Sequence, residues 1–336
     1  MRIVIGLCWT MALAVAVSSA SDSKPAKSKR GTTERAGVHT PGVQIPFASL
    51  KPDAEFSVAP DWMALAGEVW IPDSSKDGVN PIDAKSGQLG QPVSGLGKPC
   101  GGVVSAFGSL WVPDCAGQKI DRIDSKTHKV TAAIATGVAS GQPVITADAD
   151  SVWALTDAKT TLSRIDPQQN QVVAELRLPA GCEDLAFGEA ALWVACPASN
   201  QVFRVDPRTN LVDQRITVSA EPRALAIGEG SIWVLCTKDG NVDRIDPKTN
   251  QVAKSIELGV PGVQGGIAAG AGSVWVTLSG FPVTRIDPNA NRVVQQFYGS
   301  AGGAILVGEG WVWLSNRSQG SLWRLDPKRI AATLAE

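Results

Sequence analysis

Residues 230–250 begin with Gly230-Ser231-Ile232-Trp233-Val234 and end with Asp243-Arg244-Ile245-Asp246-Pro247-Lys248-Thr249-Asn250. These two blocks decide the fold, because the chain repeats them in phase. An aliphatic residue followed by tryptophan occurs seven times, with successive spacings of 41, 42, 40, 40, 42 and 38 residues. The seven tryptophans are Trp70, Trp111, Trp153, Trp193, Trp233, Trp275 and Trp313. A marker that returns at a near-constant period indicates a repeat architecture.

A second marker follows each tryptophan at a fixed distance. It is the Asp of an aliphatic-Asp pair, which stands 13 residues after the tryptophan, or 12 in one repeat; Arg precedes six of the pairs and Pro follows five. The aspartates are Asp83, Asp124, Asp166, Asp206, Asp246, Asp287 and Asp326. Asp opens turns by accepting hydrogen bonds from the backbone N–H groups that follow it. Seven equivalent copies therefore predict turn capping and argue against a catalytic role for any of them.

Each unit can be divided into four strands with turn signals between them. In the fifth unit we predict strands over residues 223–227, 231–235, 241–245 and 251–258, with Gly228-Glu229-Gly230 as a tight turn. The last of these strands alternates in polarity, which is typical of a half-exposed outer strand. Four antiparallel strands per unit, repeated seven times, predict an all-β fold: a seven-bladed β-propeller of four-stranded antiparallel blades.

The ring of blades must close, because an open stack would leave bare sheets and exposed strand edges. We expect the repeat tryptophans to fill the space between neighbouring blades. The last unit ends in a short tail, residues 328–336, whose apolar residues are out of register with the other outer strands. Residues 47–58 precede Trp70 at roughly the distance expected of an outer strand. We predict that this N-terminal strand closes the ring in the seventh blade, with the C-terminal tail as the alternative.

The beginning of the chain has the pattern of an export signal. Arg2 precedes an apolar run over residues 3–17, and Ser18-Ser19-Ala20 supplies small residues at the −3 and −1 positions of a cleavage site. An uncleaved anchor is the alternative, although the run is short for a membrane span. We expect a signal peptide at 1–20, a flexible basic linker at 21–45 and the propeller at 46–336. The protein is then secreted or periplasmic.

The composition excludes several classes of partner. Lys and Arg number 31 and Asp and Glu 32, so the net charge of −1 removes the usual electrostatic basis for nucleic-acid binding. After the first residues, no segment is long and apolar enough to span a bilayer. We expect a monomer whose partner is a small molecule, a peptide or a protein.

The cysteines occur at repeated positions relative to the tryptophans. Cys100 and Cys182 stand eleven residues before a tryptophan, and Cys115 and Cys196 stand four and three after it. Antiparallel pairing brings these positions together, so Cys100–Cys115 and Cys182–Cys196 are predicted disulfides. Cys236 is left over, and we expect a quiet, partly buried cysteine, with a reactive thiol as the alternative.

Polar residues gather where the start of each first strand and the end of each second strand meet, at one rim of the central channel. They are Asp61, Asp73, Asp114, Asp157, Glu183, Asp184, Arg223, Gln264, Asn316 and Arg317. Several carboxylates at one channel mouth could hold Mg²⁺ or Ca²⁺ through oxygen ligands, and solvated loop ends are the alternative. Trp62, Trp311 and Trp323 lie outside the repeat positions and are candidates for stacking on a ligand.

The repeated blocks, such as Ser231-Ile232-Trp233-Val234 and Asp243-Arg244-Ile245-Asp246-Pro247, resemble those of the streptogramin (virginiamycin B) lyase-like and YVTN-type propellers. The resemblance spans about residues 47–336 and implies seven blades with a funnel at one face. Lyases of this family use histidine and glutamate at the funnel, with magnesium. This chain contains two histidines, His39 and His128, and we expect neither to lie at the funnel.

The function that we predict is binding without chemistry at the funnel face of an exported propeller. The distance from tryptophan to aspartate is nearly constant, so no unit inserts a long loop between its second and third strands, as a lid would require. The alternative is a metal-dependent lyase or lactonase-type hydrolase that uses Asp73, Asp114 and Glu183. A quinone-cofactor enzyme is a third hypothesis, which no motif of the sequence supports.

Overall fold

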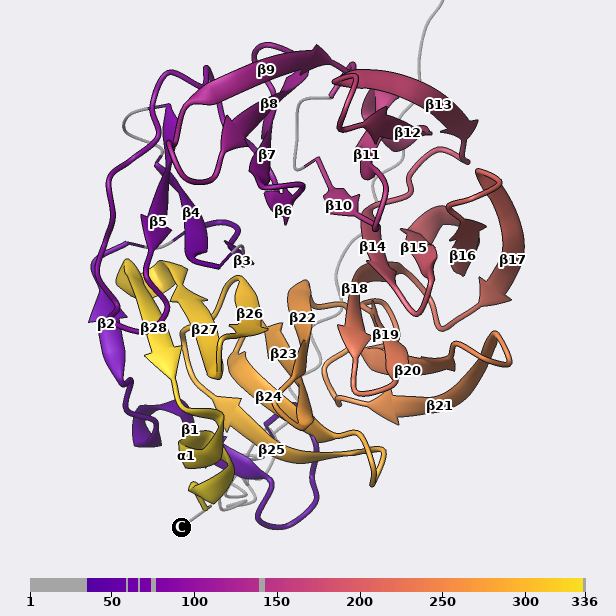
Figure 1. Ribbon diagram of the computed structural model, residues 1–336. Helices are drawn as coiled ribbons and strands as arrows, with labels where there is room; N and C mark the ends of the chain where they lie inside the picture. The colour runs from indigo at the N-terminus through magenta and orange to yellow at the C-terminus, as the bar shows by residue number, and fades with distance from the viewer. Residues whose placement is uncertain (1–34, 59, 66, 74–76, 139–142, 335–336) are drawn as a thin grey trace, which may run out of the picture. The chain divides into compact units, whose positions relative to one another are not determined.

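The computed structural model describes residues 35–336, apart from 59, 66, 74–76, 139–142 and 335–336. The predicted signal peptide and residues 21–34 of the predicted linker lie outside the described residues. Ala36–Glu336 form one compact unit. Its strands form seven sheets arranged around a centre, as the blades of a propeller (Figure 1).

The fifth blade shows the regular plan. It consists of β18 (Pro222–Gly228), β19 (Ser231–Cys236), β20 (Asn241–Asp246) and β21 (Gln251–Glu257), paired antiparallel in chain order. These strands agree with the four predicted for this unit. The second, third and fourth blades follow the same order: β6 (Val104–Ala106), β7 (Ser109–Asp114), β8 (Lys119–Asp124), β9 (Val130–Ala135); β10 (Ile145–Ala147), β11 (Val152–Thr156), β12 (Thr161–Asp166), β13 (Gln171–Arg177); β14 (Asp184–Gly188), β15 (Ala191–Cys196), β16 (Gln201–Asp206), β17 (Leu211–Thr217).

The first blade departs from four regular strands. It contains β3 (Ala64–Leu65), β4 (Val69–Asp73) and β5 (Gly78–Ile82). Isolated bridges from β5 to Leu89 and Val93 stand where an outer strand would run. Residues 86–99 contain four glycines and two prolines, which favour turns and interrupt a ladder.

The N-terminal segment closes the ring, as predicted. The seventh blade has the order β2-β28-β27-β26, in which β2 (Ala54–Phe56) pairs antiparallel with β28 (Ser321–Leu325). The other two strands are β26 (Ile305–Gly308) and β27 (Trp311–Asn316). The C-terminal tail is not a strand; it forms the helix α1 (Pro327–Ala332), which lies at the end of β28 and close to β25 (Figure 1).

A second N-terminal strand was not predicted. β1 (Gln44–Pro46) pairs parallel with β25 and makes the sixth sheet five-stranded. The remaining strands of that sheet are β22 (Gly265–Gly270), β23 (Ser273–Leu278), β24 (Phe281–Asp287) and β25 (Arg292–Tyr298). Val43 and Ile45 are buried there, so contacts with the blades begin before residue 46, where we expected the propeller to start.

The repeat tryptophans wedge neighbouring blades apart. All seven are at most 1% exposed. Trp233 packs with Val274 and Ile286 of the sixth blade, and Trp313 packs with Val69 of the first. The indole N–H of Trp233 donates to the carbonyl oxygen of Gly228 at 3.0 Å, so its polar atom is satisfied within the hairpin.

In the second, third, fifth and seventh blades, the arginine of the second marker connects its blade to the next. The guanidinium of Arg244 lies 5.2 Å from the ring of Trp233, its cross-strand neighbour. Its Nη1 donates to the Pro288 carbonyl at 2.7 Å and to Asn291 Oδ1 at 2.9 Å, both in the turn of the following blade. We call this the Arg–turn contact. Arg324 makes a comparable contact across the ring closure, to the carbonyl oxygens of Ala84 at 3.1 Å and Lys85 at 2.9 Å in the first blade.

The aspartates of the second marker cap turns, as predicted. Asp246 Oδ1 accepts from the N–H of Lys248 at 2.8 Å. Equivalent bonds are made by the other six: Asp83, Asp124, Asp166, Asp206, Asp287 and Asp326. The backbone N–H of Ser86 is the main cause that lowers the pKa of Asp83, because it stabilises the ionised carboxylate.

In six of the seven units, the residue four positions after the aspartate takes left-handed backbone geometry. It is Asn in four units, with φ between 51° and 57°, and His128 in the second, with φ 55°. The His128 ring packs edge-on against Trp70 at 5.5 Å. In the other six blades an arginine lies opposite the repeat tryptophan, but in the first blade Pro81 lies opposite Trp70. His128 therefore contacts an indole that has no arginine opposite it. This histidine is a framework residue.

Both predicted disulfides are present. Their Cα–Cα distances are 5.9 Å for Cys100–Cys115 and 3.9 Å for Cys182–Cys196. Cys236 is buried, and burial raises the pKa of its thiol, which agrees with a quiet cysteine rather than a reactive one.

The register of the fifth blade predicts a third bridge on substitution. Pro222 pairs with Cys236 and stands eleven residues before Trp233, as Cys182 stands before Trp193. P222C should therefore form a disulfide with Cys236, and its oxidised form should be about 3 kcal/mol more stable than its reduced form. Thiol titration and melting with and without reductant check this, with P222S as control. Two free thiols in oxidised P222C would contradict the expectation.

Candidate functional site

Three adjoining cavities lie where the first strands of the blades begin. Their volumes are about 410, 460 and 340 Å³, and Gln264 and Gly265 line all three. Their walls come from the segment before β3 and from blades two to seven, so they lie around the centre of the ring. We call this region the channel mouth. Its charged and large polar members are Asp61, Trp62, Lys159, Glu183, Asp184, Arg223, Gln264 and Arg317.

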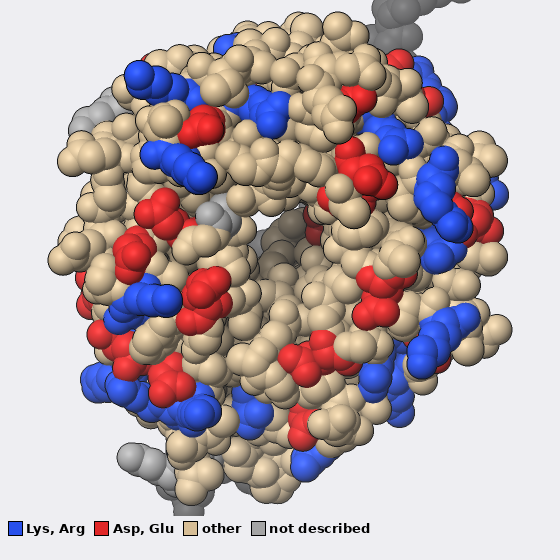
Figure 2. Space-filling view, in the orientation of Figure 1, with Lys and Arg blue, Asp and Glu red and all other residues tan. Residues whose placement is uncertain are grey.

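Figure 2 shows one face of the ring with an opening at its centre. Acidic side chains lie near this opening, whereas many lysines and arginines lie farther out. A central opening with charged walls can accept a polar ligand and concentrate it by its field.

The first charged group of the mouth is centred on Arg223. Its Nη1 donates to both carboxylate oxygens of Glu183 at 2.6 Å, and its Nη2 pairs with Glu221 at 3.3 Å. The two carboxylates, led by the hydrogen bond with Glu183, raise the pKa of Arg223. The Arg223 and Glu183 side chains remain 26% and 35% exposed, so this pair is open to a ligand and contributes about 1 kcal/mol or less to stability.

A second ion pair lies across the ring closure. Arg317 Nη2 lies 2.9 Å from Asp61 Oδ1. Arg317 begins the short 3-10 helix η4 (Arg317–Gln319) after β27, whereas Asp61 precedes β3. Both side chains are more than half exposed, so either charge is free to exchange its partner for a ligand.

Asp184 is the perturbed acid of the mouth. Its two carboxylate oxygens accept from the N–H groups of Leu185 at 2.9 Å and Leu225 at 2.7 Å. Burial raises the pKa of Asp184 to about 6, and the two N–H donors only partly oppose this. A carboxyl with this pKa changes its charge near neutral pH, which suits either pH-sensitive binding or proton transfer.

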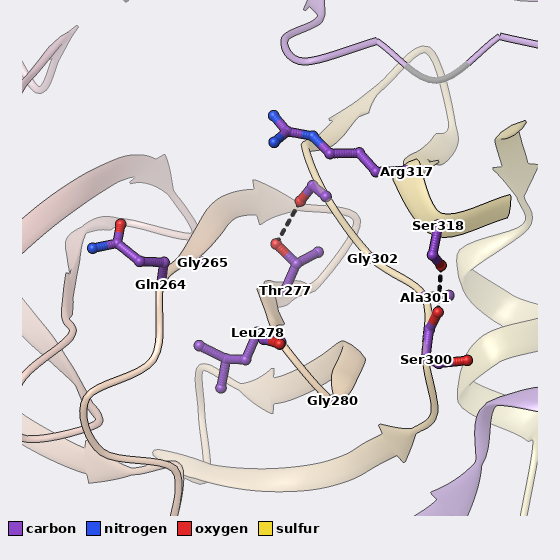
Figure 3. A pocket seen from close by; sticks show the side chains of 12 residues that line it. Gln264, Gly265, Thr277, Leu278, Gly280, Ser300, Ala301, Gly302, Arg317 and Ser318 are labelled. Atoms are coloured by element: carbon purple, nitrogen blue, oxygen red, sulfur yellow. Dashed lines mark hydrogen bonds between the residues drawn. The ribbon is translucent and has the colours of Figure 1, made fainter. Parts of the chain in front are cut away.

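Glycines open the wall formed by the sixth and seventh blades. A Cβ on Gly265 would lie 2.0 Å from the carbonyl oxygen of Thr277, so a larger residue is excluded there. The Thr277 hydroxyl accepts from the N–H of Gly266 at 3.0 Å and donates to the Gly303 carbonyl at 2.8 Å. Figure 3 shows Gln264 and Arg317 on opposite sides of this cavity, with Thr277 between them.

Six of the predicted rim residues line the cavities: Asp61, Glu183, Asp184, Arg223, Gln264 and Arg317. The structure places three others elsewhere. Asp114 is buried and accepts from the N–H groups of Lys98, Ala116 and Gly117, so it caps its own loop. Asp157 is exposed beside Arg177, and Asn316 is fully buried. The side chain of Asp73 lies outside the described part of the structure.

The hydrogen bonds of Asp114 also govern its ionisation. Burial alone would raise the pKa of this carboxyl, but the N–H donors and Lys119 outweigh burial and lower it. Its ionised oxygens are therefore committed to the loop.

Sequence reasoning missed Lys159 and Thr277 at the mouth and gave Trp62 only a subsidiary place. Lys159 Nζ donates to the backbone carbonyl of Glu183 at 3.3 Å, and Trp62 lines two of the cavities. Lys159 is the last residue of the short 3-10 helix η2 (Asp157–Lys159), and its own backbone is left-handed. In the sequence, only its distance from Trp153 could have indicated that it lies at the mouth.

The acidic residues of the mouth do not converge as a metal site. Among the residues that the structure describes, no three His, Cys, Asp or Glu side chains are arranged to hold one ion. Glu183 is engaged by Arg223 and Asp114 by its own loop. These two residues therefore do not form, with their neighbours among the described residues, the cluster of oxygen ligands that Mg²⁺ or Ca²⁺ needs.

Asp184 should give the stability of the protein a distinct pH dependence. Its pKa is raised to about 6, so between about pH 4 and pH 6 the native state holds a proton that the unfolded chain has released. The free energy of unfolding should then fall as pH rises through this range, by roughly 2 to 3 kcal/mol, and D184N should remove that fall. Urea denaturation at several pH values measures this, with D157N as an exposed control. Equal pH profiles for wild type and D184N would refute the assignment.

Comparisons with known proteins give matches at the level of structure. No protein-family model matches the chain, and no curated protein sequence matches it. Virginiamycin B lyase from Staphylococcus aureus superposes with a TM-score of 0.66 at 19% sequence identity, covering 81% of this chain and 97% of the lyase. A streptogramin B lyase gives the same score and identity over 87% of this chain and 96% of its own.

A third similar structure bears on the histidines. It is a catalytically inactive histidine-to-alanine variant of the Staphylococcus aureus lyase with quinupristin, again with a TM-score of 0.66 and 19% identity, over 81% of this chain and 97% of that one. In this protein neither His39 nor His128 lines the channel mouth. The chain has the seven-bladed β-propeller fold seen in virginiamycin B lyase.

Proposed function

We propose that this protein is an exported binding protein that holds a small molecule or peptide carrying charges of both signs at the channel mouth. The observation that carries the proposal is the grouping of two open ion pairs, Glu183–Arg223 and Asp61–Arg317, around adjoining cavities. A ligand with an ammonium and a carboxylate group matches both halves of such pairs. Trp62 and the glycine-lined wall supply apolar surface for its body.

Binding without chemistry suits the rest of the mouth. An elimination needs a base placed at the substrate, and the described residues of the mouth include no histidine. The acid with a raised pKa, Asp184, has both carboxylate oxygens occupied by the N–H groups of Leu185 and Leu225. The connections after the second strands are short, as in η3 (Pro197–Ser199), and none forms a lid over the cavities in the described part of the chain.

Export is part of the proposal. Its support is the signal-peptide pattern of residues 1–20 and the two disulfides, which are typical of oxidising compartments. No helix of the described residues is long and apolar enough to cross a bilayer.

A thermal-shift screen of amino acids, short peptides and other zwitterions tests the binding function. Ligands that raise the melting temperature of wild type should lose most of that effect in E183Q/R223Q, which keeps the shape of the ion pair and removes its charges. The matched control is D157N/R177Q, an exposed pair outside the mouth. A screen with no stabilising zwitterion, or equal shifts in both double variants, would argue against the proposal.

The alternative function is a metal-dependent lyase or lactonase-type hydrolase, which the fold similarity favours. Incubation with quinupristin, with and without Mg²⁺, tests it, and liquid chromatography follows the substrate. We expect no conversion and no metal-induced change in melting temperature, since no three acidic side chains of the described residues are arranged to hold one ion. Conversion that depends on Mg²⁺ would establish the enzyme and overturn this expectation.

A further inference from the structure

The Arg–turn contact does not form at every boundary between blades. The first blade has Pro81 in place of the arginine, and Arg204 of the fourth blade pairs with Asp213 of its own blade. The boundary after the sixth blade differs from these two, because its arginine is present and the turn that should accept from it is not formed. Arg122, Arg164 and Arg244 each donate to the asparagine in the turn of the following blade, at 2.9, 3.2 and 2.9 Å. In the seventh blade this turn is replaced by α1, and Ile330 stands where the asparagine would be, with its side chain buried in the core. Arg285 of the sixth blade therefore has no turn asparagine to bind.

The contacts of Arg285 lie within its own sheet. Its Nε donates to Gln295 Oε1 at 2.6 Å and its Nη1 to the Ser273 hydroxyl at 3.3 Å. Burial lowers the pKa of Arg285, as expected for a cation withdrawn from water with few acceptors. Part of its guanidinium fork is left without an acceptor among the described residues.

A cavity of about 680 Å³ opens beside this guanidinium. It lies between the sixth and seventh blades, away from the channel mouth, and shares no lining residue with the three cavities there. Its walls include Arg285, Trp311 and Ala331. The volume is ample for a ligand of about ten heavy atoms.

Trp311 distinguishes this boundary from the others. At the same position, two residues before the repeat tryptophan, four other blades carry serines. Three of these, Ser109, Ser151 and Ser231, accept from the arginine Nε of their blades. In the seventh blade Trp311 takes this place, is half-buried, and has the guanidinium of Arg324 4.3 Å from its ring. The ring of Trp311 therefore lines the same cavity as Arg285, whose guanidinium has N–H groups without an acceptor among the described residues.

The acidic groups near Arg285 have other partners or lie in solvent. Asp287, two residues along the strand, acts on Arg285 through its charge, and its Oδ1 accepts from the N–H groups of Asn289 at 2.8 Å and Ala290 at 3.0 Å. The Asp326 carboxylate caps the N–H of Lys328 at 2.8 Å, and Lys328 adds a second cation to the wall. Glu309 is exposed at its hairpin turn, where solvent screens it.

We propose that this cavity is a second binding site, for a small organic carboxylate with a flat apolar body. The carboxylate accepts from the free N–H groups of Arg285, which has the planar fork that matches carboxylates. The flat body packs on Trp311. The carboxylate then takes the place of the turn oxygens that Arg122, Arg164 and Arg244 receive from the following blades.

Phenylacetate and its uncharged analogue phenylacetamide are suitable probes, with binding measured on the whole protein by NMR titration. Wild type should bind phenylacetate about tenfold or more tightly than phenylacetamide, a difference that reports the carboxylate. R285Q should abolish that preference, and W311S, which restores the serine of the other blades, should weaken both probes.

R244Q is the matched control, because that arginine already has its acceptors in the next blade. It should lower the melting temperature but leave phenylacetate binding unchanged. Both probes are measured on the same variant, so a loss of stability in R285Q affects both equally and does not change the preference for phenylacetate over phenylacetamide. The proposal is overturned if phenylacetate does not saturate, if the two probes bind wild type equally, or if R285Q keeps the preference.

Discussion

The contact between an indole, a guanidinium and the turn of the next blade holds this structure together. Each blade buries one tryptophan, and in four of the seven blades an arginine opposite that tryptophan donates to backbone or asparagine oxygens of the next blade. A single sheet of about 41 residues cannot cover both of its faces. The propeller exists because this boundary repeats, and Arg324 applies it to the first and last blades as well.

The candidate sites lie where that repetition stops. The framework uses its repeated residues for packing and capping, which leaves the strand starts free to vary. Glu183, Arg223 and Gln264 stand at or next to the starts of first strands in the fourth, fifth and sixth blades, and Arg317 follows the second strand of the seventh. The second site has the same origin. Arg285 is a framework arginine, and the turn that would accept from it is replaced by α1 in the last unit.

The sequence was sufficient for the fold because the period of the tryptophans and aspartates reports blade number directly. It also located the two disulfides and the closing strand, since antiparallel pairing fixes which positions meet. It could not separate Asp114 from Asp184, because both stand at the rim by strand order. Only coordinates reveal that the first turns into its own loop and the second into the cavity. β1 escaped prediction because three residues are too few to show a period.

The pairing of β2 with β28 also sets an order of events during folding. Ala54 and Arg324, which lie opposite each other in the seventh blade, are separated by 270 positions in the chain (324 − 54 = 270). The N-terminal strand is synthesised first, yet its partner is nearly the last part of the chain to be made. Such a distant contact is slow to form, and until then both strands keep unpaired edges. A chain that stops before residue 321 would leave β2 without its partner strand, so a truncated molecule would expose a strand edge that the finished molecule covers.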